Sequence, residues 1–203
     1  MKTLIVYAHL LAACVAVGIL LIQDVALIRS KGNPLDSHSI KELIKSAKIV
    51  SIALVALWIS GALLIVIGYL ENPQQYLLDQ KLWAKFTVVL ILTINGFLLH
   101  FYSFPKIATG HGISGLSAVE QMMVMMSGAI SSVSWLFACF LGVARSWNYT
   151  VDYSYIMSIY AAILVAAIIV SSELLRFLRR NEAAAMGGEI RLGPIRNSTR
   201  KIK

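Results

Sequence analysis

Two pairs of ionisable side chains recur at one spacing within the apolar parts of the sequence. His9 and Asp24 are 15 residues apart, and so are Lys85 and His100. On an α-helix this separation corresponds to about 60° of rotation and about 22 Å of length, so the members of each pair share a face at opposite depths. If the two helices are parallel, His9 lies level with Lys85, and Asp24 lies level with His100. The spacing therefore predicts two polar layers, one near each surface of a membrane.

The outer layer, His9 and Lys85, has side chains suited to a cofactor or proton site. A neutral imidazole is a common axial ligand of haem iron, and it is also the side chain that exchanges protons near neutral pH. A structural interpretation stays open beside this one. In that interpretation Lys85 extends to the lipid headgroups and His9 bonds to a neighbouring helix.

The inner layer combines the imidazole of His100 with three carboxylates, those of Asp24, Glu120 and Glu173. Such groups can bind divalent cations or pass protons. All four lie within a turn or two of a predicted helix end, however, where water reaches them. An Asp24–His100 ion pair or hydrogen bond without a metal is therefore favoured, and no metal site is assigned. The depths also exclude one haem bound by both His9 and His100.

The composition is that of an integral membrane protein. Of the 203 residues, 58% are hydrophobic and 14% are charged, and the mean hydropathy is +0.75. Ordinary soluble domains are much more polar. A membrane-spanning helix needs about 20 apolar residues. Five segments reach this length, so we predict an all-α bundle of five transmembrane helices at about 4–28, 47–69, 82–104, 120–143 and 154–178.

Lysine and arginine are unevenly divided between the two ends of these helices. Fourteen lie at one end, and four lie at the other, namely Lys2, Lys81, Lys85 and Arg145. Because cytoplasmic loops are enriched in these residues, the N-terminus is predicted outside and the C-terminus in the cytoplasm. The first and third helices then run parallel, as the two layers require. Residues 1–180 form one transmembrane domain, and 181–203 form a flexible basic cytoplasmic tail.

The formal charge of +8 is concentrated beside apolar segments, in the first loop and the C-terminal region. This placement favours anionic lipid headgroups as partners over nucleic acid, and it leaves open membrane-protein partners or a homo-oligomer. The sequence holds no nucleotide-binding loop, hydrolytic triad or zinc-protease helix, so an enzyme of the soluble type is not expected. Cys14 and Cys139, both inside apolar segments, are predicted to be packing residues.

Three local patterns predict contacts within the bundle. Small polar residues between Ser127 and Ser134 allow close helix approach and interhelical hydrogen bonds. Glu173 and Arg176, three residues apart, predict an intrahelical ion pair. The segment 39–42 has the spacing of a capping box, although a simple cytoplasmic extension of the second helix is favoured there.

The first half of the chain also carries a recognisable set of residues along its first three helices. They are His9, Trp58-Ile59-Ser60-Gly61, Leu82-Trp83-Ala84-Lys85, Asn95-Gly96 and His100. Over residues 1–104 this set resembles the small polytopic membrane protoporphyrinogen oxidases and the copper-resistance D-type domains. The resemblance implies a helical bundle in a bacterial inner membrane, with haem b bound through His9 and Lys85. The first helix of that family tends to end in Pro-Arg, whereas this chain has Gln23-Asp24, so we do not extend the resemblance to porphyrin oxidation.

Three functions are compatible with these observations. The first is a small cytoplasmic-membrane protein that binds haem or another redox cofactor near the outer surface, through His9 and Lys85. The second is an ion, proton or small-solute transport subunit that uses the inner layer. The third is a structural or accessory subunit whose polar groups only hold the helices together. The sequence alone does not decide among them.

Overall fold

The protein is built from long α-helices. The computed structural model describes residues 2–29, 37–103 and 116–191, and these residues form no β-strand. The five long helices are α1 (Lys2–Arg29), α2 (Ser37–Glu71), α4 (Gln80–Leu98), α6 (Ala118–Val143) and α7 (Tyr153–Arg191). The short elements are α3 (Pro73–Tyr76), the π-helical turn η1 (Leu99–Ser103) and the 3-10 turn η2 (Arg145–Trp147).

Among the described residues, five helices are long and apolar enough to cross a membrane, so the prediction of five apolar helices is confirmed. Two boundaries differ from the prediction. Because α2 already begins at Ser37, the segment 39–42 lies inside the helix, as the favoured interpretation of a helix extension predicts. At the other end of the chain, α7 continues to Arg191 and includes the first part of the predicted tail. The remainder of that tail, 192–203, lies outside the described residues.

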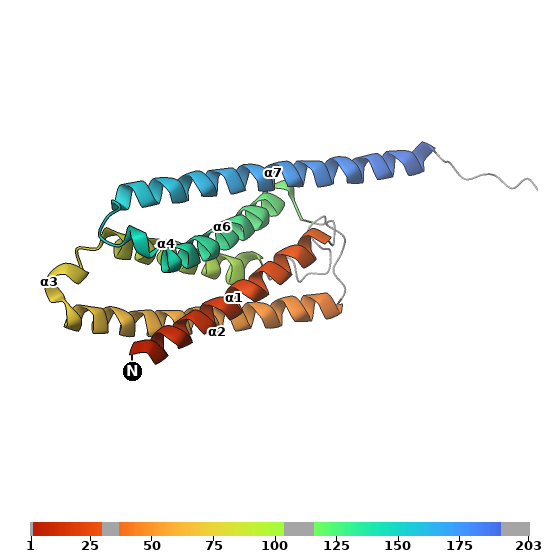
Figure 1. The fold of residues 1–203 in the computed structure, drawn as a ribbon. Helices are drawn as coiled ribbons and strands as arrows, with labels where there is room; N and C mark the ends of the chain where they lie inside the picture. Colours follow the sequence, from red (N-terminus) through yellow and green to blue (C-terminus); the bar gives the residue numbers. More distant parts are fainter. Residues whose placement is uncertain (1, 30–36, 104–115, 192–203) are drawn as a thin grey trace, which may run out of the picture.

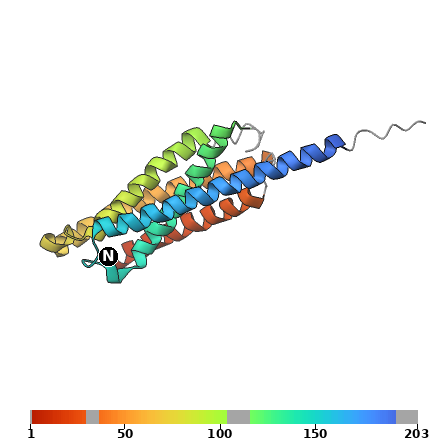
Figure 2. The ribbon, with the colours of Figure 1, turned by 90° about the horizontal axis from the view of Figure 1, so that it is seen from above.

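Successive long helices run in opposite directions, so α1, α4 and α7 all point the same way (Figure 1). This is the parallel relation between α1 and α4 that the two polar layers require. The closest partner of α1 is α2, while α6 packs on both α4 and α7 and also contacts α1. The view from above in Figure 2 shows the same elongated bundle, with the last turns of α7 extending beyond the other helices.

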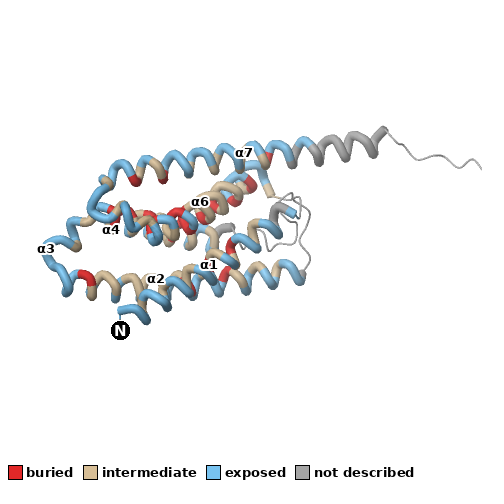
Figure 3. The backbone as a smooth tube through the Cα atoms, viewed as in Figure 1, coloured by how far each residue is buried: buried red, intermediate tan, exposed pale blue. Residues whose placement is uncertain are grey.

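Buried residues lie along the inner faces of the helices, most densely on α6 and α4 (Figure 3). One apolar cluster joins α4, α6 and α7 and includes Val88 and Tyr160. A second joins α1, α2, α4 and α6 and includes Ala16 and Trp135. Large apolar side chains such as Ile22 cover the outer faces, where lipid is the natural environment.

Polar side chains connect the helices inside this apolar bundle. Asn95 of α4 donates to the Ser127 carbonyl of α6 at 2.8 Å, and the Ser127 hydroxyl donates back to Asn95 Oδ1 at 3.0 Å. Ser134 of α6 and Tyr160 of α7 are joined at 2.7 Å. The prediction that the small polar residues of the fourth segment form interhelical hydrogen bonds is confirmed.

The Asn95–Ser127 pair gives a test of this packing. We expect Asn95→Ala to lower the free energy of unfolding in mild detergent by about 1 kcal/mol, the usual size of an interhelical hydrogen bond within a membrane. Ser127→Ala in the Asn95→Ala background should then cost less than it does alone, because the two side chains share one interaction. The lipid-facing Ile94, 55% exposed, supplies the control variant Ile94→Ala. Additive losses in the double variant would contradict the pairing.

Candidate functional site

His9 is held against α2 by a hydrogen bond to Ser60. Its Nδ1 lies 2.7 Å from Ser60 Oγ. The serine hydroxyl has a single hydrogen, which it donates to the Ala56 carbonyl at 2.6 Å. Ser60 Oγ therefore accepts the Nδ1–H of His9. In the neutral imidazole the lone pair is then on Nε2, which is the arrangement of a histidine oriented to bind a metal centre.

The Trp58-Ile59-Ser60-Gly61 segment contacts both helices next to α2. A methyl group on Gly61 would come 3.6 Å from His9 Cε1, so the half-buried imidazole of α1 lies over the Ser60-Gly61 step. On its other side the segment reaches α4, where Trp58 Nε1 donates to Thr93 Oγ1 at 3.0 Å. The segment thus places His9 relative to both α2 and α4.

Lys85 is the second member of the outer layer, and the structure brings it near His9. It is half-buried on α4, and its charge acts on the His9 imidazole. Within residues 2–29, 37–103 and 116–191, no hydrogen bond or ion pair to the Lys85 ammonium is formed. A cation without a protein partner at this depth is costly, which makes it a candidate for contact with a ligand.

Lys81 has a structural role that sequence reasoning missed. Its side chain is buried, with 2% of the residue exposed, and Nζ donates to the Ala144 carbonyl at 2.5 Å and to Asn148 Oδ1 at 2.8 Å. Ala144 ends α6, where the partial negative charge of the helix C-terminus favours a cation. Asp79 completes this corner by accepting from the backbone amides of Lys81 and Tyr149. No spacing rule connects residues so far apart in the sequence.

The four residues of the inner layer are not brought into one cluster. Asp24 accepts a hydrogen bond from Ser132 of α6 at 2.5 Å, in place of the predicted partner His100. Glu120 forms a capping box with Ser117 at the start of α6. In the described part of the chain, no group of three or more His, Cys, Asp or Glu side chains could hold a metal ion.

The other two members of the inner layer have different surroundings. Glu173 pairs with Arg176 at 2.7 Å on the exposed side of α7, which confirms the predicted intrahelical pair. His100 lies in the π-helical turn that follows α4, and it lines a cavity between α1, α2, α4 and α6. The residues of the predicted inner layer therefore form separate side-chain pairs, and His100 lies beside a cavity.

Comparison with known proteins adds no assignment. No family model matches the chain, and no curated protein or solved structure matches it significantly. The functional conclusion therefore comes from the side chains themselves, and the resemblance over residues 1–104 stays a prediction.

Substitutions of the two neighbouring lysines of α4 are expected to differ in their effect on stability. Lys81→Met should lower the free energy of unfolding by about 1–3 kcal/mol, because it removes two hydrogen bonds from a charged donor. Lys85→Met, the matched control one turn further along, should leave stability unchanged or raise it. Thermal unfolding in mild detergent measures both. Equal losses in the two variants would show that Lys85 also has a structural partner.

Proposed function

We propose that this chain is a multi-pass protein of the bacterial cytoplasmic membrane, with the N-terminus outside and the C-terminus inside. Five apolar helices of sufficient length support the membrane assignment. Their alternating directions put the start of α1 and the end of α7 at opposite ends of the bundle. The end of the bundle at which α7 ends also has most of the lysine and arginine residues, which supports the cytoplasmic placement of that end.

The orientation has a direct test. A reporter that is active only in the cytoplasm, fused after Lys203, should be active, and an export-dependent enzyme at the same position should be inactive. The reverse pair of results would invert the assignment of outer and inner halves. As a control, both reporters fused within the 72–79 turn, between α2 and α4, should give the opposite pattern.

The function proposed for the outer half is binding of haem b, or of another metal-centred redox cofactor, through His9 with Lys85. The observation that carries this proposal is the Ser60 hydrogen bond, which occupies His9 Nδ1 and leaves the lone pair on Nε2. Lys85, a nearby cation without a hydrogen bond or ion pair in the described residues, fits a carboxylate such as a haem propionate. Bound haem would supply one-electron redox chemistry. The resemblance over residues 1–104 points to the same two side chains.

The chain's own groups have distinct parts in this proposal. His9 binds, Ser60 orients the imidazole by accepting from Nδ1–H, and Lys85 attracts an anionic group. No second histidine of the described residues lies near His9, because His38 and His100 are both at the other end of the bundle. Within the described residues, the cofactor would therefore have one histidine ligand.

A purely structural or accessory function is the second candidate, and one observation favours it. Polar side chains of the bundle interior are used in interhelical hydrogen bonds, as in the Asn95–Ser127 and Ser132–Asp24 pairs. In this alternative the His9–Ser60 bond is one more such connection between α1 and α2.

An absorption spectrum separates the two candidates. Protein purified in mild detergent from haem-supplied cells should show a Soret band that is lost in His9→Ala and weakened or shifted in Ser60→Ala and Lys85→Gln. His100→Ala, at the other end of the bundle, should keep the band and serves as the matched control. A correctly folded parent without any chromophore, or an equal loss in His100→Ala, would favour the accessory function.

A further inference from the structure

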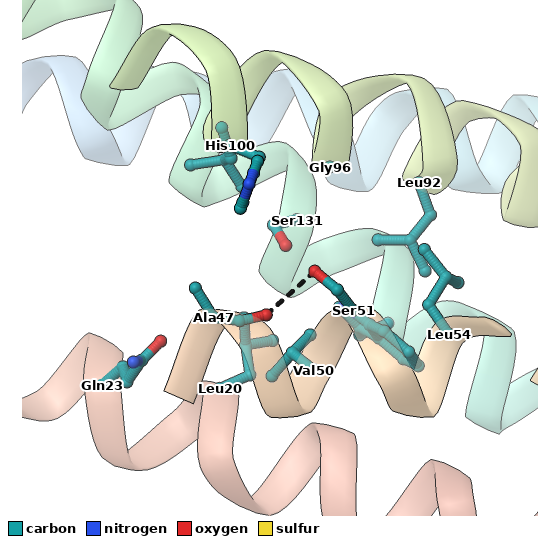
Figure 4. Close-up of a pocket in the computed structure, with 12 residues that line it drawn as sticks. Leu20, Gln23, Ala47, Val50, Ser51, Leu54, Leu92, Gly96, His100 and Ser131 are labelled. Atoms are coloured by element: carbon teal, nitrogen blue, oxygen red, sulfur yellow. Dashed lines mark hydrogen bonds between the residues drawn. The ribbon is translucent and has the colours of Figure 1, made fainter. Parts of the chain in front are cut away.

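A cavity of about 70 Å³ lies in the inner half of the bundle, where α1, α2, α4 and α6 meet. Its walls are mostly apolar and include Leu20, Leu92 and Trp135. Polar side chains enter it from four elements, namely Gln23 of α1, Ser51 of α2, His100 of η1 and Ser131 of α6. Figure 4 shows the two serine hydroxyls and the His100 ring directed toward the same space.

The hydroxyl of Ser131 determines what the cavity can hold. Ser131 is buried, with 5% of the residue exposed, and no hydrogen bond to its side chain is formed within the described residues. Every described side-chain nitrogen or oxygen that is sealed from solvent has a partner. Ser131 Oγ therefore reaches the cavity. A buried hydroxyl is strongly unfavourable without a hydrogen bond, so an occupant that can hydrogen-bond is favoured over an apolar one.

The other polar groups also have bonding capacity to spare. Ser51 donates its hydroxyl hydrogen to the Ala47 carbonyl at 2.9 Å, so its oxygen can still accept (Figure 4). Gln23 donates from Nε2 to the Leu43 carbonyl at 3.3 Å, so its Oε1 can also accept. An occupant with both donors and acceptors would satisfy all three side chains. Apolar ligands would leave Ser131 without a partner.

The volume of the cavity and the charge of its lining further limit which molecules can occupy it. The residues that line the cavity include no lysine, arginine or carboxylate, so a cation there would have no side chain of opposite charge. A water molecule needs about 10–15 Å³ of such volume, so the cavity could hold about five waters. A porphyrin is far too large for it.

We propose that this cavity, lined by Ser131 and Trp135 among others, is an internal water site that brings the imidazole of His100 into contact with water inside the bundle. The ligand class is water and uncharged hydrogen-bonding molecules of similar size. The site is distinct from His9 and Lys85 at the outer end and does not depend on a cofactor there. The π-helical turn that carries His100 fits this role, because such turns often occur at functional positions in helices.

Radiolytic hydroxyl-radical labelling in lipid nanodiscs tests the site, since bound water generates radicals that oxidise the side chains beside it. Trp135 and Phe137 form a matched pair on α6: both are buried, at 3% and 5% exposure, but only Trp135 lines the cavity. After correction for intrinsic reactivity, Trp135 should be oxidised severalfold faster than Phe137.

Two variants complete the experiment. Ser131→Val narrows the cavity and replaces the hydroxyl with methyl groups, and it should reduce Trp135 oxidation toward the level of Phe137. Ser131→Ala removes the hydroxyl with little change in volume, so it keeps the test valid if the larger residue prevents folding, and it should give a partial loss. Equal slow oxidation of Trp135 and Phe137 in the parent would mean a dry or lipid-filled cavity. Fast Trp135 oxidation that neither variant reduces would mean that water reaches Trp135 by another route. Either result overturns the proposal.

Discussion

In the hydrocarbon region of a membrane, no water is available to hydrogen-bond a polar side chain, so neighbouring helices must supply its partners. This constraint organises the bundle. Ser60 pairs with His9, Thr93 pairs with Trp58, and Ser132 pairs with Asp24. The Ser60 and Thr93 hydroxyls also donate to a carbonyl of their own helix. The same contacts thus hold the helices together and supply hydrogen-bond partners to the polar side chains. A substitution that removes such a hydrogen bond therefore also weakens helix packing.

Lys85 and Ser131 depart from this pattern in different ways. Neither has a side-chain hydrogen-bond partner within the described residues. Lys85 has a charge and a long apolar stem that can extend toward the headgroups, while Ser131 is fixed in the interior with only a cavity beside it. The first fits an anionic group near the outer surface, and the second fits water in the inner half. The two proposed sites are therefore separated by the apolar middle of the bundle.

Much of the fold follows from the sequence, because long apolar runs and helical spacing are local properties. The 15-residue spacing predicts that His9 and Lys85 lie at one depth, and the parallel directions of α1 and α4 agree with this relation. Spacing gives the face and depth of a side chain, however, and not the residue opposite it. The partner of Asp24 proved to be Ser132 and the partners of Lys81 lie in the turn after α6. The cavity beside His100 depends on four elements together and has no sequence pattern of its own.

The α1–α2 hairpin described above can form as soon as α2 has been synthesised, because its contacts are close in sequence. The hydrogen bond of Asp24 forms later, since its partner Ser132 comes 108 residues further along the chain. At a typical rate of chain synthesis this delay is about 5 to 20 s. During that interval the carboxyl group lacks its Ser132 partner, so we expect this end of α1 to stay near water until α6 has been synthesised. The order of synthesis thus favours early formation of the α1–α2 contacts, with the Asp24–Ser132 hydrogen bond formed last.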